Sequence, residues 1–358
     1  MWQILAMIGL NFINYRFGRC TKYLRICIMC LYGFSFIFTT LINVSYILSK
    51  RYKEGISYML QTVNSVITWY FAFSKKKEIS IILLKIYRLH KKYNILKKKN
   101  SQHIKLLITI ILITPYIICI FVYTLTNQNM KRIDNWTFGF SVRSIVWRRI
   151  ILFTGNITVL CFTSCFVFYL TISVSVLFHR YSEVLSNYNI LLKTGLNRRV
   201  NHNLKFLEIF FDIAKIAQKL SEHLKNVSFI ILFYGLHGIF STLLLISNRR
   251  IHFSEYEYSI TLMYYFSCSI IIIVIYTVCS STISENMKKI KRTAREFINR
   301  YFCIQPGLQE YLFYLMRIES EEVVHLSVCG LFYLKRGFLL TALGTILTYG
   351  LLLINLNV

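Results

Sequence analysis

The chain has 358 residues, of which 55% are hydrophobic, and its mean hydropathy is +0.51. Apolar runs recur along the whole length, so the composition excludes a soluble globular protein and predicts a polytopic membrane protein. The formal net charge is +27, but Lys and Arg gather between the apolar runs and do not line one amphipathic face. We therefore expect contact with a lipid bilayer and no nucleic-acid partner.

Seven apolar runs are long enough to cross the hydrocarbon core of a bilayer, which takes about 20 helical residues. No linker or repeat divides them, so we expect one all-α, multi-pass domain over residues 1–358. The long connections 179–225 and 284–330 are predicted to form a cytoplasmic anchor region of extended helices. The predicted spans cover 25–48, 56–73, 105–125, 150–178, 226–247, 259–283 and 335–355.

The distribution of Lys and Arg predicts the orientation, because cytoplasmic connections hold the excess of these residues. The amino-terminal segment and the even-numbered connections hold 28 of them, whereas the odd-numbered connections hold 10. The amino terminus is thus predicted in the cytoplasm, and seven spans place the carboxy terminus outside. This is the reverse of a G-protein-coupled receptor. Asn135 begins an Asn-Trp-Thr sequon in an outward connection and is a candidate glycosylation site.

Polar residues of the last predicted span share one helical face. At 100° per residue the stripe from Thr341 to Asn355 fills an arc of about 80°. Because polar groups that face lipid are unfavourable, this stripe either packs against helices of the same subunit or lines a wetted pore. In a pore, hydroxyl and amide oxygens replace cation hydration, and Leu352 and Leu356 form apolar constrictions. The candidate pore-lining residues are Thr341, Thr345, Thr348, Leu352, Asn355 and Leu356.

A ligand pocket is expected where the outward halves of the first six spans meet. An apolar, aromatic cavity with a few convergent polar groups is typical of a small-molecule site. Each of these side chains also has a structural interpretation as a packing residue. The candidate ligand-binding residues are Asn64, Tyr116, Tyr123, Asn156, His237, Ser241, Tyr264 and Tyr265.

The carboxy-terminal segment LSVCGLFYLKRGFLLTALGTILTYGLLLINLNV resembles the signature of the insect gustatory receptor family. In that signature a Gly-Leu-Phe stretch precedes the last helix, and Thr-Tyr lies shortly before a Gln-Phe end. Asn355 and Leu356 stand where the family has Gln and Phe. The segment LEIFFDIAKIAQKLSEHLKN also resembles the family's cytoplasmic helical extension. The matching signature positions are Gly330, Leu331, Phe332, Leu334, Gly344, Thr348 and Tyr349.

The resemblance implies a function as well as a fold. It implies a chemoreceptor in the plasma membrane that detects a small-molecule tastant and conducts cations as a tetramer of identical or related subunits. It also implies that the seventh span is split into a cytoplasmic anchoring helix and a pore-lining helix. Two alternatives stay open: a carrier with alternating access as the first, and a related insect odorant receptor as the second. Carriers often contain inverted repeats and interrupted helix pairs, and neither is detected in this sequence. The Gly-Leu-Phe and Thr-Tyr positions favour the gustatory type over the odorant type.

No enzymatic chemistry is expected. The sequence has no Gly-rich phosphate loop and no Gly-x-Ser-x-Gly motif. Glu322 and His325 have the spacing of a carboxylate–histidine metal motif, but the motif occurs once, and a di-iron site needs two copies with further Glu residues. We therefore predict neither a metal nor a cofactor.

The charge asymmetry predicts where tags will be accessible. An epitope tag after Val358 should be stained on intact cells, whereas a tag before Met1 should be stained only after permeabilisation. Immunofluorescence with and without detergent measures both. The opposite pattern of staining would contradict the predicted orientation.

Overall fold

The computed structural model describes residues 19–48, 52–92, 142–160, 166–197, 204–247, 256–301 and 309–356, and these are almost entirely helical. An all-α fold is thus confirmed for this part of the chain. A small antiparallel hairpin joins β1 (Ser327–Val328) to β2 (Phe332–Tyr333). The helices are α2 (Arg19–Leu48), α3 (Tyr52–Ser74), α4 (Lys76–Lys92), α7 (Ile145–Leu160), α8 (Phe166–Asn197), α9 (Leu204–Ser247), α10 (Tyr256–Tyr301), α11 (Gln309–Ser320) and α12 (Arg336–Leu356).

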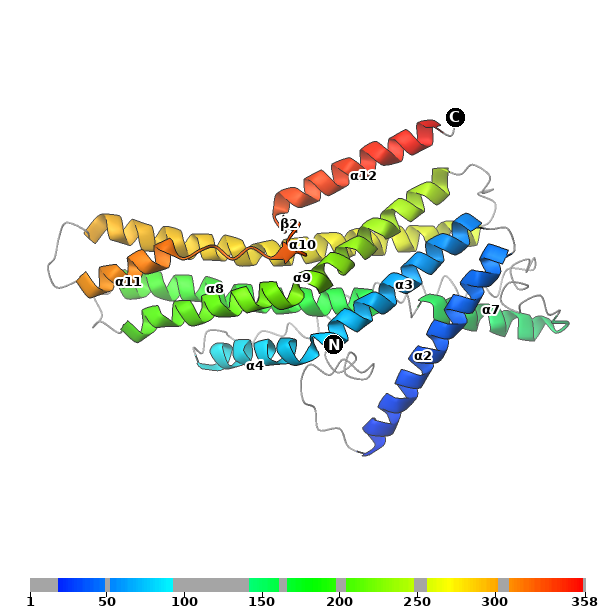
Figure 1. Ribbon diagram of the computed structural model, residues 1–358, viewed down its shortest axis with the longest axis horizontal. Helices are drawn as coiled ribbons and strands as arrows, with labels where there is room; N and C mark the ends of the chain where they lie inside the picture. The colour runs from blue at the N-terminus through cyan, green and yellow to red at the C-terminus, as the bar shows by residue number, and fades with distance from the viewer. Residues whose placement is uncertain are drawn as a thin grey trace.

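The long helices α8, α9 and α10 run along the length of the molecule and form its centre (Figure 1). Helices α2 and α3 pack together toward one end, and α11 covers the opposite end of α9 and α10. Large side chains fill the space between the central helices, because burying apolar surface is the main favourable term in packing. The largest fully buried ones include Tyr181, Tyr276, Phe178, Phe210 and Leu185.

Hydrogen bonds between buried polar groups hold the central helices in register. The amide of Asn286 on α10 donates to Ser182 on α8, at 2.7 Å from its Oγ, and Thr293 donates to Asn189 at 2.8 Å. Both pairs have the same sequence offset of 104 residues, as parallel helices require. Because a buried polar group without a partner is costly, a shift of one helix along the other would be penalised.

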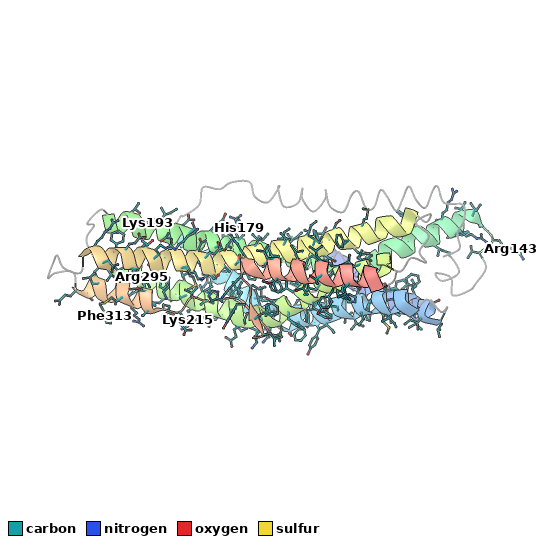
Figure 2. The ribbon with its side chains drawn as sticks, turned by 90° about the horizontal axis from the view of Figure 1, so that it is seen from above. Arg143, His179, Lys193, Lys215, Arg295 and Phe313 are labelled. Atoms are coloured by element: carbon teal, nitrogen blue, oxygen red, sulfur yellow. The ribbon has the colours of Figure 1, made fainter. Side chains whose placement is uncertain are left out.

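The exposed surface of the helices divides into an apolar zone and a charged zone. On α9 the exposed face passes from Lys215 and Lys225 to Phe229 and Phe233. Figure 2 shows Lys193, Lys215, Arg295 and Phe313, from four different helices, toward the same end of the molecule, and Arg143 at the opposite end. An apolar belt beside a charged end is the surface expected of a membrane protein that extends beyond the bilayer.

The bounds of several helices differ from the bounds of the predicted spans. The single run predicted over 150–178 falls in two helices, α7 and α8, and residues 161–165 between them lie outside the described part, as does the predicted span 105–125. The connection 179–225 consists mainly of helix, because α8 continues to Asn197 and α9 already begins at Leu204. Among the described helices, two are long and apolar enough to cross a membrane, within Glu208–Leu243 and Tyr265–Arg300.

A close crossing of α9 and α10 depends on Gly238. A Cβ atom at this position would lie 2.1 Å from the Oγ atom and 3.2 Å from the Cβ atom of Ser269. Gly238→Ala should therefore lower the free energy of unfolding by about 1–3 kcal/mol through overpacking. The melting temperature of detergent-solubilised protein measures this.

Gly33 on α2 provides a matched control for this prediction. A Cβ atom there meets no heavy atom within 4 Å, so Gly33→Ala should leave the melting temperature unchanged or raise it. Adding Ser269→Ala to Gly238→Ala should recover part of the loss, because it removes the hydroxyl group that the new methyl group would meet. Equal melting temperatures for Gly238→Ala and the parent would contradict the close crossing.

Candidate functional site

The candidate site is helix α12 together with the hairpin that leads into it. Leu331 donates its backbone N–H to Val328 O at 2.9 Å, and the two residues between them, Cys329 and Gly330, have φ values of 49° and 76°. Positive φ at both central positions defines the tight turn that favours Gly, so the Gly of the signature has a conformational reason.

The hairpin is fastened to α9 before α12 begins. The hydroxyl of Ser221 donates to His325 O at 3.1 Å, and the backbone N–H of Cys329 donates to Lys225 O at 3.4 Å. Leu326, Val328 and Leu334 are buried beneath the hairpin. The amino-terminal end of α12 is therefore held against the bundle at the border between its charged and apolar zones.

Two contacts join the first turn of α12 to its surroundings. The ring of Phe332 on β2 stacks on Phe338, with 4.9 Å between centroids and 14° between planes. Arg336 pairs with Glu285 of α10 through two contacts of 2.8 Å, one from Nε to Oε1 and one from Nη2 to Oε2. A bidentate pair of this kind fixes the direction of the guanidinium as well as its charge.

One face of α12 packs on the bundle. Ala342 and Ile346 are buried, and a Cβ atom at Gly350 would lie 3.1 Å from Leu243 of α9. This packed face contains no hydroxyl or amide side chain among the residues whose side chains the structure describes. The apolar face of the helix is thus used to attach it to α9 and α10.

The threonine stripe lies on the opposite face and is exposed. Thr341, Thr345, Thr348 and Leu352 all point away from the rest of the chain. Figure 1 shows α12 at the edge of the bundle, with one side open. Packing against helices of the same subunit, one of the two interpretations of the stripe, is therefore not seen for these four residues. Asn355 lies within α12, but its side chain and that of Leu356 are outside the described part.

The hydroxyl groups of the stripe have a uniform geometry. Thr345 Oγ1 donates to Thr341 O at 2.8 Å, Thr348 Oγ1 donates to Gly344 O at 2.9 Å, and Thr341 Oγ1 donates to Gly337 O at 3.2 Å. Each hydroxyl hydrogen is used by the helix backbone, so the oxygen lone pairs are left to face outward. The exposed face of α12 consequently presents hydrogen-bond acceptors.

The predicted ligand residues whose side chains the structure describes lie on α3, α9 and α10. Asn64 on α3 and Tyr265 on α10 are buried, and α9 packs against both helices. On α9 the ring nitrogen Nε2 of His237 lies 3.2 Å from Ser241 Oγ. Tyr116, Tyr123 and the sequon Asn135 lie outside the described residues, as do the side chains of Asn156 and Tyr264.

Two buried polar atoms of this group are without a partner in the described part of the chain. They are Nδ2 of Asn64 and Nδ1 of His237. Buried polar atoms are normally hydrogen-bonded, so each of these calls for a partner of another kind, such as water or a bound molecule. The ring of His237 also stacks on Phe233, with 6.1 Å between centroids, which gives this region an aromatic surface.

The amino-terminal end of α12 has a positive electrostatic environment. Burial and the charges of Lys288 and Lys335 lower the pKa of the His325 imidazole from its ordinary value. The lowered pKa favours the neutral form of the His325 imidazole. Among the described residues, no three His, Cys, Asp or Glu side chains gather as potential metal ligands.

Glu285 is the residue of this site that the sequence did not single out. It lies 51 residues before Arg336, so no local spacing connects the two. The available signal is weak: one acidic residue follows the apolar run of α10 and precedes a run of Lys and Arg. Helical periodicity finds the stripe but cannot find a partner that only tertiary packing brings close.

The comparisons with known proteins identify the fold. No protein-family model matches the chain, and no curated protein matches it in sequence. The solved structure of the insect olfactory receptor OR5 from Machilis hrabei matches with a TM-score of 0.65 and 10% identity, over 99% of this chain and 98% of that chain. The same receptor in complex with eugenol matches with a TM-score of 0.64 and 9% identity, over 99% and 97%. The chain thus has the fold of an insect olfactory receptor over its whole length.

Proposed function

We propose that this chain is a subunit of a ligand-gated cation channel of the insect chemoreceptor type. The observation that supports this most strongly is the exposed, acceptor-rich stripe of α12 on the face opposite its packing contacts. The full-length likeness in fold to OR5 supports the same class. In the proposed assembly four copies surround one axis, and each contributes its stripe to a shared pore.

The threonine stripe presents oxygen atoms that can interact with cations. The outward lone pairs of Thr341, Thr345 and Thr348 are acceptors, and oxygen acceptors replace part of the hydration shell of a cation. Leu352 and Leu356 follow at the outer end of α12 and narrow the path with apolar groups, which can close it by excluding water. Anions would find few donors on this face, so the proposed current is carried by cations.

The proposed orientation has seven spans in the plasma membrane, a cytoplasmic amino terminus and an extracellular carboxy terminus. The separation in Figure 2 supports it, since Lys193, Lys215 and Arg295 belong to predicted inward connections and Arg143 to an outward one. The α12 stripe then passes from the inner edge of the bilayer to its outer surface.

The proposed ligand is a small molecule, and a taste role is the first candidate. The signature around Gly330 and Phe332 supports the gustatory type, because Gly330 forms the turn and Phe332 stacks on α12. An odorant-detecting role is the second candidate, and the fold likeness to OR5 favours it. Since the second OR5 structure contains eugenol, small aromatic compounds are a reasonable first panel for this chain.

Cysteine substitution along α12 tests the pore directly. Thr345→Cys and Thr348→Cys should react with a small water-soluble thiol reagent and change the current. The wetted face supplies both access and thiolate, whereas a thiol in an apolar setting stays protonated. Ile346→Cys on the packed face should not react, and Cys329 should first be replaced, because it is exposed near the inner end.

A second substitution on α12 tests the proposed apolar constriction at Leu352. Leu352→Ser should give current without any ligand, because the substitution weakens the barrier to water. Whole-cell recording measures this leak. Equal reactivity of Thr345→Cys and Ile346→Cys, or protection of the whole stripe in every state, would mean that the threonines do not face a pore.

The ligand site has its own test. Replacing His237 with Ala should raise the concentration of an activating compound for half-maximal current by about tenfold, the loss of one contact of roughly 1.4 kcal/mol. His179→Ala is the matched control, because His179 is exposed and pairs with Glu183 away from α3. If the dose–response curve of His237→Ala coincides with that of the parent, the ligand binds elsewhere.

A further inference from the structure

Glu285 lies where the apolar surface of α10 ends and its charged surface begins. On the exposed side of this helix the last large apolar residue is Val278, and the next exposed residues are Lys288 and Lys289. Glu285 stands between them, at the level at which α12 starts, and binds Arg336 at 2.8 Å. It is therefore an acidic group among cations at the inner end of α12.

This end of α12 is otherwise positive. Lys335 and Arg336 lie at its first turn, and the free N–H groups of a helix amino terminus add a partial positive charge there. Lys335 and Lys288 already disfavour protonation of His325 nearby. A cation that leaves the threonine stripe toward the cytoplasm would meet these charges first, and four copies would multiply them.

The ion pair with Glu285 also determines the position of the positive charge of Arg336. At 100° per residue Arg336 is about 140° from the centre of the stripe, on the flank of α12 that faces α10. The bidentate contact holds its guanidinium on this flank. Without Glu285 the long Arg side chain would be free to sample other rotamers, including those nearer the stripe.

We propose that Glu285 is a positioning residue for ion passage, which tethers Arg336 on the flank of α12 and offsets its charge so that cations can pass the inner end of the pore. This inference rests on the proposed channel function and deepens it by naming the residue that controls charge at the inner mouth. The tether differs from a structural strut. The Arg336 side chain is 62% exposed and the Glu285 side chain is 36% exposed, so solvent screens the pair and reduces its contribution to folding stability.

The test uses the full chain and needs no ligand. Sodium currents are recorded in the Leu352→Ser background, which is expected to conduct spontaneously. Adding Glu285→Gln should lower single-channel conductance at least twofold, with a larger loss at low ionic strength, where charge is less screened. Arg336→Gln should not lower conductance, because it removes the charge that the tether restrains. The combination of both substitutions should conduct like Arg336→Gln alone.

Arg295 and Glu319 provide a matched control. They form a second Arg–Glu pair at 2.5 Å, with exposures of 65% and 28%, between α10 and α11 and away from α12. Glu319→Gln should leave conductance unchanged. Surface labelling of every variant verifies that the amount of channel in the membrane is the same.

Three results would overturn the tether. If Arg336→Gln lowers conductance as much as Glu285→Gln, the pair is only a strut. If Glu285→Gln still lowers conductance when Arg336 is already Gln, Glu285 acts on cations by itself. If Glu285→Gln leaves the conductance of the Leu352→Ser channel unchanged, the tether is contradicted but the channel function is not. Absence of current from Leu352→Ser contradicts the channel function on which the tether rests.

Discussion

The structure depends on how one helix with two unlike faces is placed. α12 must bury its apolar face, and it does so with Ala342, Ile346 and Gly350 against α9 and α10. That contact forces Thr341, Thr345 and Thr348 to the other side. A hydroxyl stripe is unfavourable against lipid, so the packing of one face determines that the other face needs either water or another protein surface.

The other helices of the bundle hold α12 in a fixed position along α9 and α10. Hydrogen bonds between α8 and α10 keep the two central helices in register. The hairpin is bonded to α9 through Ser221 and Lys225. The Phe332–Phe338 stack then carries this rigidity into the first turn of α12, where the Arg336–Glu285 pair orients the guanidinium. These contacts connect the start of α12 to α9 and α10.

The features that the sequence could predict are local ones. The stripe of α12 depends on spacing within one helix, and the apolar runs mark the helices α2, α3, α9 and α10 because burial and lipid contact both select apolar residues. Gly330 and Phe332 belong to the segment that resembles the gustatory receptor signature, and the structure gives a reason for each. Gly330 lies in the tight turn, and Phe332 stacks on Phe338.

The features that it could not predict need tertiary contacts. The pairing of Glu285 with Arg336, or of Ser182 with Asn286, joins residues 51 or 104 positions apart. The bounds of α7 and α8 also differ from the one predicted span over 150–178, because hydrophobicity alone locates the ends of a helix poorly. The ligand residues are predicted from direction and polarity, and among those that the structure describes His237 and Ser241 contact each other.

The central claim is that four α12 stripes surround a shared axis, and single-particle imaging of the purified protein in lipid nanodiscs tests it most directly. The account predicts particles with four-fold symmetry in which Thr341, Thr345 and Thr348 face a central water-filled path, while Ala342 and Ile346 stay packed on α9 and α10. Monomeric particles, or an assembly in which the threonine stripe faces lipid, would contradict it.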